Sequence, residues 1–236
     1  MRYSPKSIDV FLLGGGFGRR LKKISGGLPK PMVKVGSKPF LDIIISYLAG
    51  FGFRNFIIGT GYKADIVESY YRNRKIPGLS VLFSREKRPL DTGGAVKNAV
   101  GLIRSNPFLV LNGDSFCKFN PLDFLRFHRQ KKALISILLK KITDAGEYGA
   151  IRIDRNSRLL EFTEKNKFAG SSFVNAGVYL MDKEAIKLFP LKRKFSLERE
   201  FFPRMTSKRV YGYKKSGFFV DIGTPERLKS ARRILR

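Results

Sequence analysis

A glycine-rich segment ending in two arginines is the first feature of the sequence that could do chemistry. Residues 13–21 read Leu-Gly-Gly-Gly-Phe-Gly-Arg-Arg-Leu and follow an apolar run. Glycines let backbone N–H groups approach a phosphate closely, and Arg20 adds a fixed fork of donors. The spacing fits neither the dinucleotide-binding fingerprint nor the P-loop. The segment therefore predicts a phosphate cradle, with a flexible turn as the alternative.

A lysine between two prolines follows nine residues later. Pro29 and Pro31 flank Lys30, and proline restricts the backbone on both sides of it. A lysine held in this way suits contact with a phosphoryl oxygen. Taken in isolation, the same residues would fit an exposed turn equally well.

Two aspartates each end an apolar run and lie beside glycine. Asp114 follows Asn112 and Gly113, and Asp221 precedes Ile222 and Gly223. Carboxylates at the carboxyl edge of an α/β sheet lie where ligands bind, and two of them with nucleotide phosphates suit Mg²⁺. A single aspartate after a strand is usually a helix cap, so the pair is what indicates a metal site.

The elements that must position these residues alternate along the first part of the chain. Apolar periodicity predicts strands at 8–13, 55–58, 81–83, 108–111 and 134–139, with helices at 41–48, 64–71, 94–103 and 122–129. After about residue 144 we expect shorter strands at 150–153, 159–164 and 174–181, a helix at 197–205, and a closing strand and helix within 218–235. This order is typical of an α/β, Rossmann-like open mixed sheet in a single domain, 1–236.

Charge and composition limit the partners. Lys and Arg number 47 against 19 Asp and Glu, giving a formal net charge of +28, which would fit nucleic acid, an anionic membrane surface or anionic substrates. The basic residues are spread in short clusters, so most should coat the surface and leave only weak polyanion or anionic-surface association. No helix-turn-helix, zinc-ligand spacing or RNP-like motif is present, so no specific nucleic-acid partner is expected.

The same composition suggests a cytoplasmic protein. The one cysteine, Cys117, excludes disulfide stapling and fits a reducing compartment. No apolar stretch is long enough for a transmembrane helix. The one histidine, His128, lies in a predicted helix and is expected on its surface rather than in catalysis.

The chain resembles the sugar-1-phosphate nucleotidyltransferases. That family's opening signature, Leu-Ala-Gly-Gly-x-Gly-Thr-Arg-Leu followed by Pro-Lys-Pro, corresponds to residues 13–21 and 29–31. Further similar segments are 38–41, 61–64, 92–95, 112–116, 195–198 and 221–226. Within the family, the D-glycero-D-manno-heptose 1-phosphate guanylyltransferases are the most similar subgroup.

The resemblance implies a nucleotide-diphospho-sugar transferase (GT-A-like) fold, with a nucleotide-binding part at about 1–140 and a sugar-phosphate-binding part at about 141–236. It implies transfer of a nucleotidyl group from an NTP, with GTP expected first, to a sugar 1-phosphate, with the heptose expected first. The products would be an NDP-sugar and pyrophosphate, formed by Mg²⁺-assisted in-line displacement for polysaccharide biosynthesis. The attacking phosphate oxygen is already ionised, so positioning and charge neutralisation suffice.

The resemblance also implies roles for individual residues. The expected catalytic residues are Arg20, Lys30, Asp114, Asp221 and Lys165, and the two aspartates would hold Mg²⁺. The expected nucleotide-binding residues are Leu13, Gly14, Gly15, Gly16, Gly18, Arg20, Thr92, Gly93, Gly94 and Asn112. The expected sugar-phosphate-binding residues are Tyr148, Gly149, Glu164, Lys165 and Asn175. For Glu164 and Asn175, a salt-bridged strand residue and a turn are the alternatives.

Two departures from the family pattern leave other functions open. Arg19 replaces the signature threonine, and Asp91 stands where the heptose enzymes usually have glycine and a related muramic-acid phosphate uridylyltransferase has an acidic residue. The alternatives are therefore UTP, CTP or dTTP as the donor, with base choice set near Gly14, Arg85 and Glu86. A catalytically silent regulatory or polyanion-binding relative is a further alternative, although Arg20, Lys30, Asp114 and Asp221 are all retained.

Overall fold

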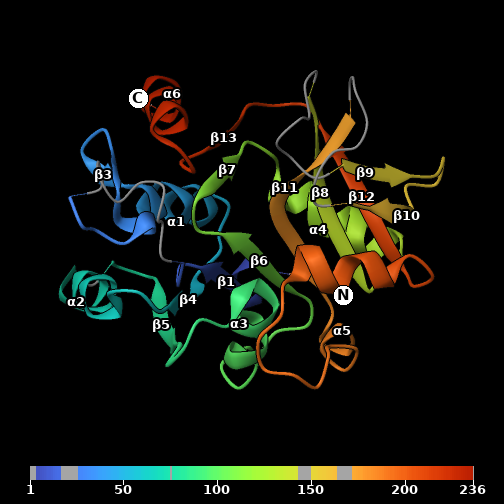
Figure 1. Ribbon diagram of the computed structural model, residues 1–236, viewed down its shortest axis with the longest axis horizontal. Helices are drawn as coiled ribbons and strands as arrows, with labels where there is room; N and C mark the ends of the chain where they lie inside the picture. The colour runs from blue at the N-terminus through green and yellow to red at the C-terminus, as the bar shows by residue number, and fades with distance from the viewer. Residues whose placement is uncertain (1–3, 17–25, 75, 143–149, 164–171, 236) are drawn as a thin grey trace.

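The computed structural model describes residues 4–16, 26–74, 76–142, 150–163 and 172–235. The first half of the chain builds four parallel strands in the order β5-β4-β1-β6 (Figure 1). These are β1 (Asp9–Leu13), β4 (Asn55–Thr60), β5 (Ser80–Arg85) and β6 (Phe108–Asn112). β1, at the centre, is fully buried over Val10–Leu12, as its uninterrupted apolar run predicts.

The second half extends the same sheet with mixed strand directions. β11 (Ser172–Met181) runs antiparallel to β6 and to β8 (Ile135–Ile142), and β12 (Val210–Lys215) runs parallel to β8. The hairpin of β9 (Ala150–Ile153) and β10 (Leu159–Phe162) pairs with the beginning of β11. This arrangement confirms the predicted open mixed α/β sheet.

β11 changes its pairing partners partway along its length. Its register with β8 shifts between Asn175 and Tyr179, so its first residues lie between β8 and β9 and its last ones between β8 and β6. Gly177 lies within the shift at φ +69°, which favours glycine. A Cβ there would also come within 2.7 Å of the Asn112 side-chain nitrogen, so glycine is required on both counts.

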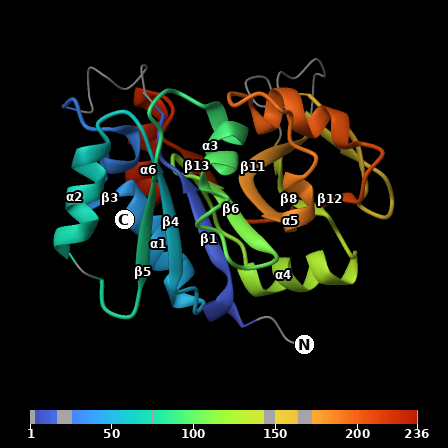
Figure 2. The same cartoon turned by 90° about the horizontal axis from the view of Figure 1, so that it is seen from below.

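Helices cover both faces of the sheet, because alternate strand residues point to opposite sides. Val10 and Leu12 pack in a core with residues of α1, α2, α4 and α6, whereas Phe11 packs in a second core with residues of α3, α5 and the segment 197–205. Figure 2 shows the same sheet from a perpendicular direction. The helices are α1 (Phe40–Gly50), α2 (Ala64–Arg74), α3 (Asp91–Ala99), α4 (Pro121–Gln130), α5 (Lys183–Ile186) and α6 (Pro225–Ile234).

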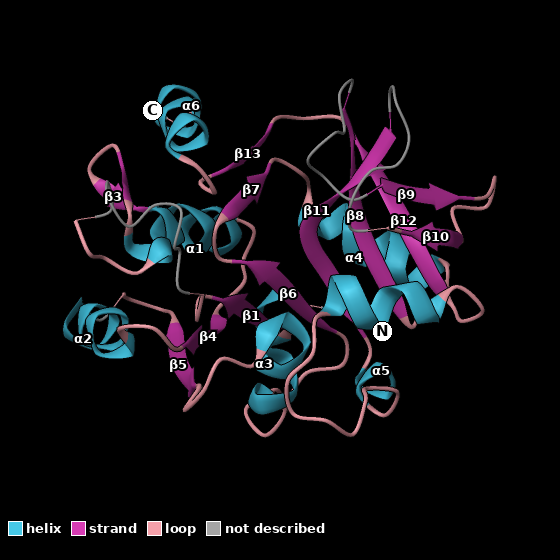
Figure 3. Cartoon of the chain, in the orientation of Figure 1, coloured by secondary structure: helices cyan, strands magenta, loops and turns pink. Residues whose placement is uncertain are grey.

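Short elements complete the fold (Figure 3). β7 (Ser115–Cys117) pairs with β13 (Phe219–Asp221), and β2 (Lys34–Val35) pairs with β3 (Lys38–Pro39). The turns of 3-10 helix are η1 (Pro5–Ser7), η3 (Lys30–Met32) and η5 (Phe202–Met205), and η4 (Leu197–Phe201) is a π-helical turn. α4 and α6 begin with the pattern that favours helix starts: Asn120 and Thr224 accept backbone hydrogen bonds, and proline follows each.

Several features differ from the sequence predictions. The strands β2, β3, β7 and β12 and the helix α5 were not predicted. α3 begins at Asp91, three residues before the predicted start, because Gly93 and Gly94 lie inside the helix. It ends at Ala99, four residues before the predicted end. The predicted helix at 197–205 is two short irregular turns instead of one regular helix.

His128 is buried rather than on the surface. Its ring nitrogens lie 2.8 Å from the Ser136 hydroxyl and 3.3 Å from an Asp182 carboxylate oxygen. Ser136 is completely buried, so this Ser-His-Asp set is closed to a substrate and has a structural role. Among the described residues, no helix is long and apolar enough to cross a membrane.

Candidate active site

The glycine-rich segment and Asp114 meet because their strands are neighbours. Leu13 at the end of β1 is the register partner of Asn112 at the end of β6. The Gly113 N–H donates to the Leu13 carbonyl at 3.0 Å, which brings the two chain segments together just beyond the sheet. This is the carboxyl edge at which α/β sheets bind ligands.

The glycines of this segment have different reasons for being glycine. A Cβ on Gly14 would lie 2.8 Å from the Gly59 carbonyl oxygen, and one on Gly15 would overlap the Glu86 carboxylate. Gly16, in contrast, has open space around it and lines a cavity. Close approach of two backbones therefore explains Gly14, and the Glu86 side chain leaves no room for a Cβ on Gly15, whereas Gly16 is the glycine of this segment with space for a ligand beside it.

Lys30 forms an ion pair with Asp114. Pro29 precedes the short turn η3, and Lys30 and Pro31 begin it, so the lysine is held by the surrounding backbone as the two prolines predict. Its side chain is 17% exposed and that of Asp114 is 37% exposed. The pair is therefore sheltered but still reachable from the cavity.

The two aspartates come together through the pairing of β7 with β13. Asp221 is the register partner of Ser115, and the Ile222 N–H donates to the Asp114 carbonyl at 2.9 Å. The Asp221 carboxylate accepts from the Gly223 N–H at 2.7 Å and from the Arg227 guanidinium at 3.2 Å. Both residues offer only oxygen, which a hard divalent cation prefers.

These two carboxylates fit a cation that keeps much of its coordination free. Within the described part of the chain, no cluster of three or more potential metal ligands forms. Mg²⁺ is commonly held by one or two carboxylates together with water and substrate phosphates. A carboxylate has about four lone-pair positions, so the contacts of Asp221 with Arg227 and Gly223 leave room for a cation.

A cavity of about 440 Å³ opens beside this pair. Among the described residues it carries four carboxylates, on Glu86, Asp91, Asp114 and Glu198. Burial raises the pKa of Glu86, although the Leu90 N–H donates to it. The other described lining residues are Leu13, Gly15, Gly16, Pro89, Leu90, Thr92, Ala95, Asn112, Ser196 and Arg199.

A hydrogen-bonded chain connects the cavity to β11. The Thr92 hydroxyl donates to Glu198 at 2.5 Å, and the buried Tyr179 hydroxyl donates to the other oxygen of Glu198 at 2.9 Å. Asn175 donates to Tyr179 at 2.6 Å and accepts from the Gly177 N–H. Burial, with the nearby Glu198 charge, raises the pKa of Tyr179, so this phenol stays neutral and can keep donating.

The start of α3 forms one wall of the cavity. The N–H groups of Gly93 and Gly94 both donate to the Phe195 carbonyl, at 2.9 and 3.1 Å. These two glycines therefore serve the contact with the 193–196 segment, where a Cβ on either would overlap Phe195 or Arg193. Asp91 begins the helix at φ +57°, a conformation that glycine adopts without strain.

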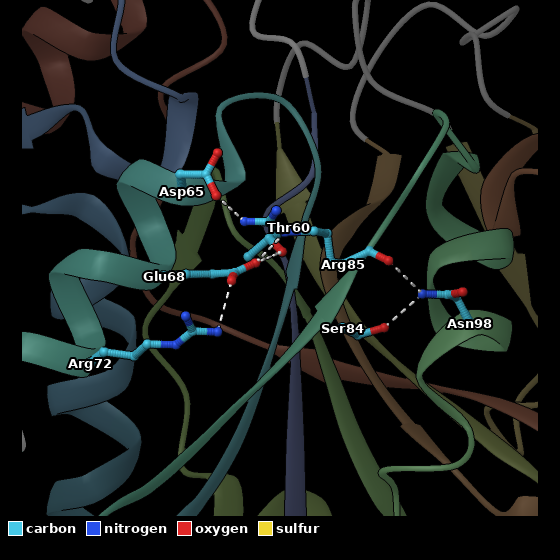
Figure 4. A network of polar contacts seen from close by, with 7 residues as sticks. All are labelled: Thr60, Asp65, Glu68, Arg72, Ser84, Arg85 and Asn98. Carbon is cyan, nitrogen blue, oxygen red and sulfur yellow. Dashed lines mark hydrogen bonds and ion pairs between the residues drawn. The ribbon is translucent and has the colours of Figure 1, made fainter.

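A polar network connects the ends of β4 and β5 to α2 (Figure 4). Buried Glu68 accepts from Thr60 at 2.9 Å, from Arg72 at 3.0 Å and from Arg85 at 2.9 Å. Arg85 also pairs with Asp65. Its guanidinium is thus directed toward α2, and Arg85 is not among the described residues that line this cavity.

Asn112 and Ser115 lie at the base of the site with unsatisfied atoms. The Asn112 side-chain oxygen and the Ser115 hydroxyl are buried and have no hydrogen-bond partner within the described part of the chain. Asn112 also lines the cavity. Since buried polar atoms normally have partners, Asn112 is a further candidate for contact with a ligand.

The structure gathers part of the predicted site. Around the cavity it brings together Leu13, Gly15, Gly16, Thr92, Asn112 and Asp114. Lys30 and Asp221 reach it through Asp114, and Asn175 reaches it through Tyr179 and Glu198. Six predicted site residues lie outside the described part of the chain: Gly18, Arg20, Tyr148, Gly149, Glu164 and Lys165; Arg19, the departure from the family signature, lies there too.

Sequence reasoning did not single out several lining residues as site residues. They are Glu86, Ser196, Glu198 and Arg199. Ser196 and Glu198 lie in the 195–198 segment that resembles the family, so a signal for them was present. For Glu86 the sequence indicated only that base choice is set near it.

Known proteins resemble this chain over nearly its whole length. A family model described as Nucleotidyl transferase matches residues 10–236. The D-glycero-alpha-D-manno-heptose 1-phosphate guanylyltransferase of Aneurinibacillus thermoaerophilus is 34% identical over 230 residues, which make up 97% of this chain and 99% of the relative. The mannose-1-phosphate guanylyltransferase of Mycobacterium tuberculosis is 32% identical over 222 residues, which make up 93% of this chain and 62% of that longer relative.

A solved structure agrees in fold and sequence. The crystal structure of HddC from Yersinia pseudotuberculosis matches with a TM-score of 0.87 and 34% identity, covering 97% of this chain and all of that one. The same protein complexed with GMP-PN matches with a TM-score of 0.86.

Proposed function

Because the chain belongs to the nucleotidyl transferase family, we propose that it transfers a guanylyl group from GTP to D-glycero-D-manno-heptose 1-phosphate, releasing pyrophosphate. The observation that carries the proposal is the Lys30–Asp114 pair, whose aspartate lines the same cavity as the end of the glycine-rich strand. The similarity to heptose 1-phosphate guanylyltransferases over nearly the full length supports the choice of donor and acceptor.

The proposed reaction requires positioning and charge neutralisation more than proton transfer. A sugar 1-phosphate oxygen is ionised at neutral pH and can attack the α-phosphorus directly, with the pyrophosphate leaving in line. Lys30 would stabilise the negative charge that gathers on the α-phosphoryl oxygens. The ion pair with Asp114 holds the Lys30 ammonium beside the cavity before substrate arrives.

Asp114 and Asp221 would hold the divalent cation, which we propose is Mg²⁺. When bound, it would supply positive charge next to the triphosphate oxygens. Arg227 contacts Asp221 and so fixes the orientation of that carboxylate.

The nucleotide would occupy the cavity lined by Leu13, Gly15, Gly16, Thr92 and Asn112. Gly14 would support the cavity indirectly, through its backbone hydrogen bond with Gly59. Gly93 and Gly94 would do so by holding α3 against the Phe195 carbonyl. Arg20 and the N–H groups up to Gly18 would hold the β and γ phosphates. These assignments to the phosphate-binding segment rest on the family resemblance.

The sugar phosphate would bind on the β11 side. Asn175 would contact a sugar hydroxyl, and its connection to Glu198 through Tyr179 would fix its orientation. Glu164 and Lys165, with Tyr148 and Gly149, complete the proposed set by resemblance. The second candidate acceptor is mannose 1-phosphate, because the M. tuberculosis mannose-1-phosphate guanylyltransferase is 32% identical to this chain.

The test is a matrix of donors and acceptors. Purified protein with Mg²⁺ is incubated with GTP, UTP, CTP or dTTP, each against the heptose phosphate, mannose 1-phosphate and glucose 1-phosphate, and pyrophosphate release is followed. We expect the highest kcat/KM for GTP with the heptose phosphate. A higher value for another pair would replace the proposed substrates, and no release from any pair would contradict the proposed activity. Omission of Mg²⁺, with Mn²⁺ and Ca²⁺ added back, tests the cation.

A further inference from the structure

A second cavity, which we call the basic cavity, lies on the other side of Pro89 and Leu90 from the proposed nucleotide site. Its volume is about 650 Å³, and Pro89 and Leu90 line both cavities. Its described lining contains six basic side chains and no carboxylate. The six are Arg85, Lys87, Arg88, Lys97, Arg193 and Lys194.

Two of the six charges already have partners. Arg85 forms ion pairs with Asp65 and Glu68. The Lys97 ammonium donates to the backbone carbonyls of Pro190 at 2.7 Å and Leu191 at 3.0 Å. These two side chains therefore stabilise the walls of the cavity, and their charges are already engaged within the chain.

The other four are arranged as two adjacent pairs, Lys87 with Arg88 and Arg193 with Lys194. All four are exposed, and none of them forms an ion pair with an acidic residue of the described chain. Neighbouring Lys192, in contrast, pairs with Glu200. Like charges gathered at a hollow repel one another, and a multivalent anion would relieve that repulsion.

Backbone hydrogen bonds hold the two segments that carry these pairs beside each other. The Phe195 N–H donates to the Leu90 carbonyl at 3.1 Å, which ties the 193–195 segment to the residues that follow Arg88. The Phe195 carbonyl accepts from Gly93 and Gly94, and Lys97 anchors the chain before Arg193. Because these are contacts within the chain itself, little ordering of the backbone is required for binding.

We propose that the basic cavity binds a linear oligophosphate, with two or three linked phosphoryl groups, either free or as the tail of a nucleotide. Two guanidinium forks and two ammonium groups match the several oxygens of such a chain. A hollow of this size suits a compact anion, whereas a membrane surface or a nucleic-acid backbone would bind a flat or extended basic surface equally well. This proposal does not depend on the proposed catalytic activity.

The test is calorimetric titration of inorganic tripolyphosphate into the full chain at 150 mM salt. The variants Arg193→Gln/Lys194→Gln and Lys87→Gln/Arg88→Gln should each weaken binding at least about tenfold, since each removes two charge-assisted contacts. The matched control is Lys229→Gln/Arg233→Gln on α6, which removes the same charge from an exposed surface and should change binding less than about twofold. Thermal unfolding of every variant confirms that it folds.

Titration with GTP distinguishes the two sources of the oligophosphate. If the ligand is a nucleotide tail, the unaltered chain takes up one more equivalent of GTP than the Arg193→Gln/Lys194→Gln variant does. If it is free oligophosphate, only tripolyphosphate binding changes. Equal tripolyphosphate affinity in all four proteins would overturn the proposal, as would an equal loss in the α6 control. Cavity-dependent binding to vesicles of anionic lipid or to single-stranded DNA, without tripolyphosphate binding, would also overturn it.

Discussion

The two neighbouring cavities are lined by opposite charges although they share Pro89 and Leu90. Of the described residues, the proposed nucleotide site presents four carboxylates and one cation, Arg199, whereas the basic cavity presents six cations and no carboxylate. The net charge of +28 is therefore not a uniform coat. The total charge of a chain therefore predicts the charge of its ligands poorly when the fold places acidic and basic side chains on the two sides of one wall.

The wall between the cavities consists of Pro89, Leu90 and the first turn of α3, packed against residues 193–196. Its residues alternate between the two sides: Thr92 and Ala95 line the carboxylate side, whereas Gly94 and Lys97 line the basic side. The contrast between the cavities is tested by removing a carboxylate, by disturbing the wall, and by neutralising Glu86, a partly buried acid of the lining.

The largest effect is expected from Asp114→Asn, which removes the carboxylate nearest to Lys30. Turnover should fall about a hundred- to a thousandfold, because a preorganised charge contact in the site is lost. The fold should survive, since the Asp114 side chain is 37% exposed. Pyrophosphate release measures turnover, and thermal unfolding measures the stability of the fold.

The control is Asp123→Asn, which removes a carboxylate paired with Arg126 on α4 and should leave turnover unchanged. Full Mg²⁺-dependent activity in Asp114→Asn would refute the assignment of this residue.

An intermediate effect is expected from Gly93→Ala in the wall. The added Cβ would overlap the ring of Phe195, so the helix and the 193–196 segment must separate. We expect a loss of about 1–3 kcal/mol in the free energy of unfolding, measured by denaturant titration. Gly101→Ala has open space around its Cβ and should change stability by less than about 0.5 kcal/mol. Equal stability of the two variants would show that the wall is not tightly packed.

The smallest effect is expected from Glu86→Gln. Burial raises the pKa of Glu86 in the folded chain, so the charged form destabilises the fold, and this loss grows as the pH rises through the raised value. The variant should therefore melt about one or two degrees higher at pH 7, and the gap should close near about pH 4. Hydrogen bonds lower the pKa of Glu226, so Glu226→Gln should show no such gain. A gap for Glu86→Gln that is independent of pH would contradict the assignment.

Local patterns predicted the parts of the site that depend on single strands. The apolar runs before Gly14 and Asp114 predicted the strand ends, and parallel neighbours then bring those ends together. The prolines around Lys30 predicted a held lysine, and the structure supplies its partner. The glycines were harder to interpret, because local spacing does not reveal what lies beside them: the Gly59 carbonyl at Gly14, the Glu86 carboxylate at Gly15 and the Phe195 ring at Gly93.

Contacts between distant segments could not be predicted. Glu198 reaches Thr92 across more than a hundred residues, so its place in the cavity depends on how η4 packs against α3. His128 was expected on the helix surface because its partners, Ser136 and Asp182, come from β8 and from the residue before α5. β12 was not predicted because glycine, here Gly212, is unfavourable inside a strand. The structure shows why glycine stands there: a Cβ would overlap the Leu139 side chain.

The shift in β11 has a consequence for how the molecule unfolds. β11 pairs with β6 of the first half and with β8 and β9 of the second, and the boundary expected near residue 140 falls within β8. Neither half can therefore open without breaking hydrogen bonds of the other. We expect the amide protons of β6 and β8 to exchange with solvent in one cooperative event, because both strands are hydrogen-bonded to β11.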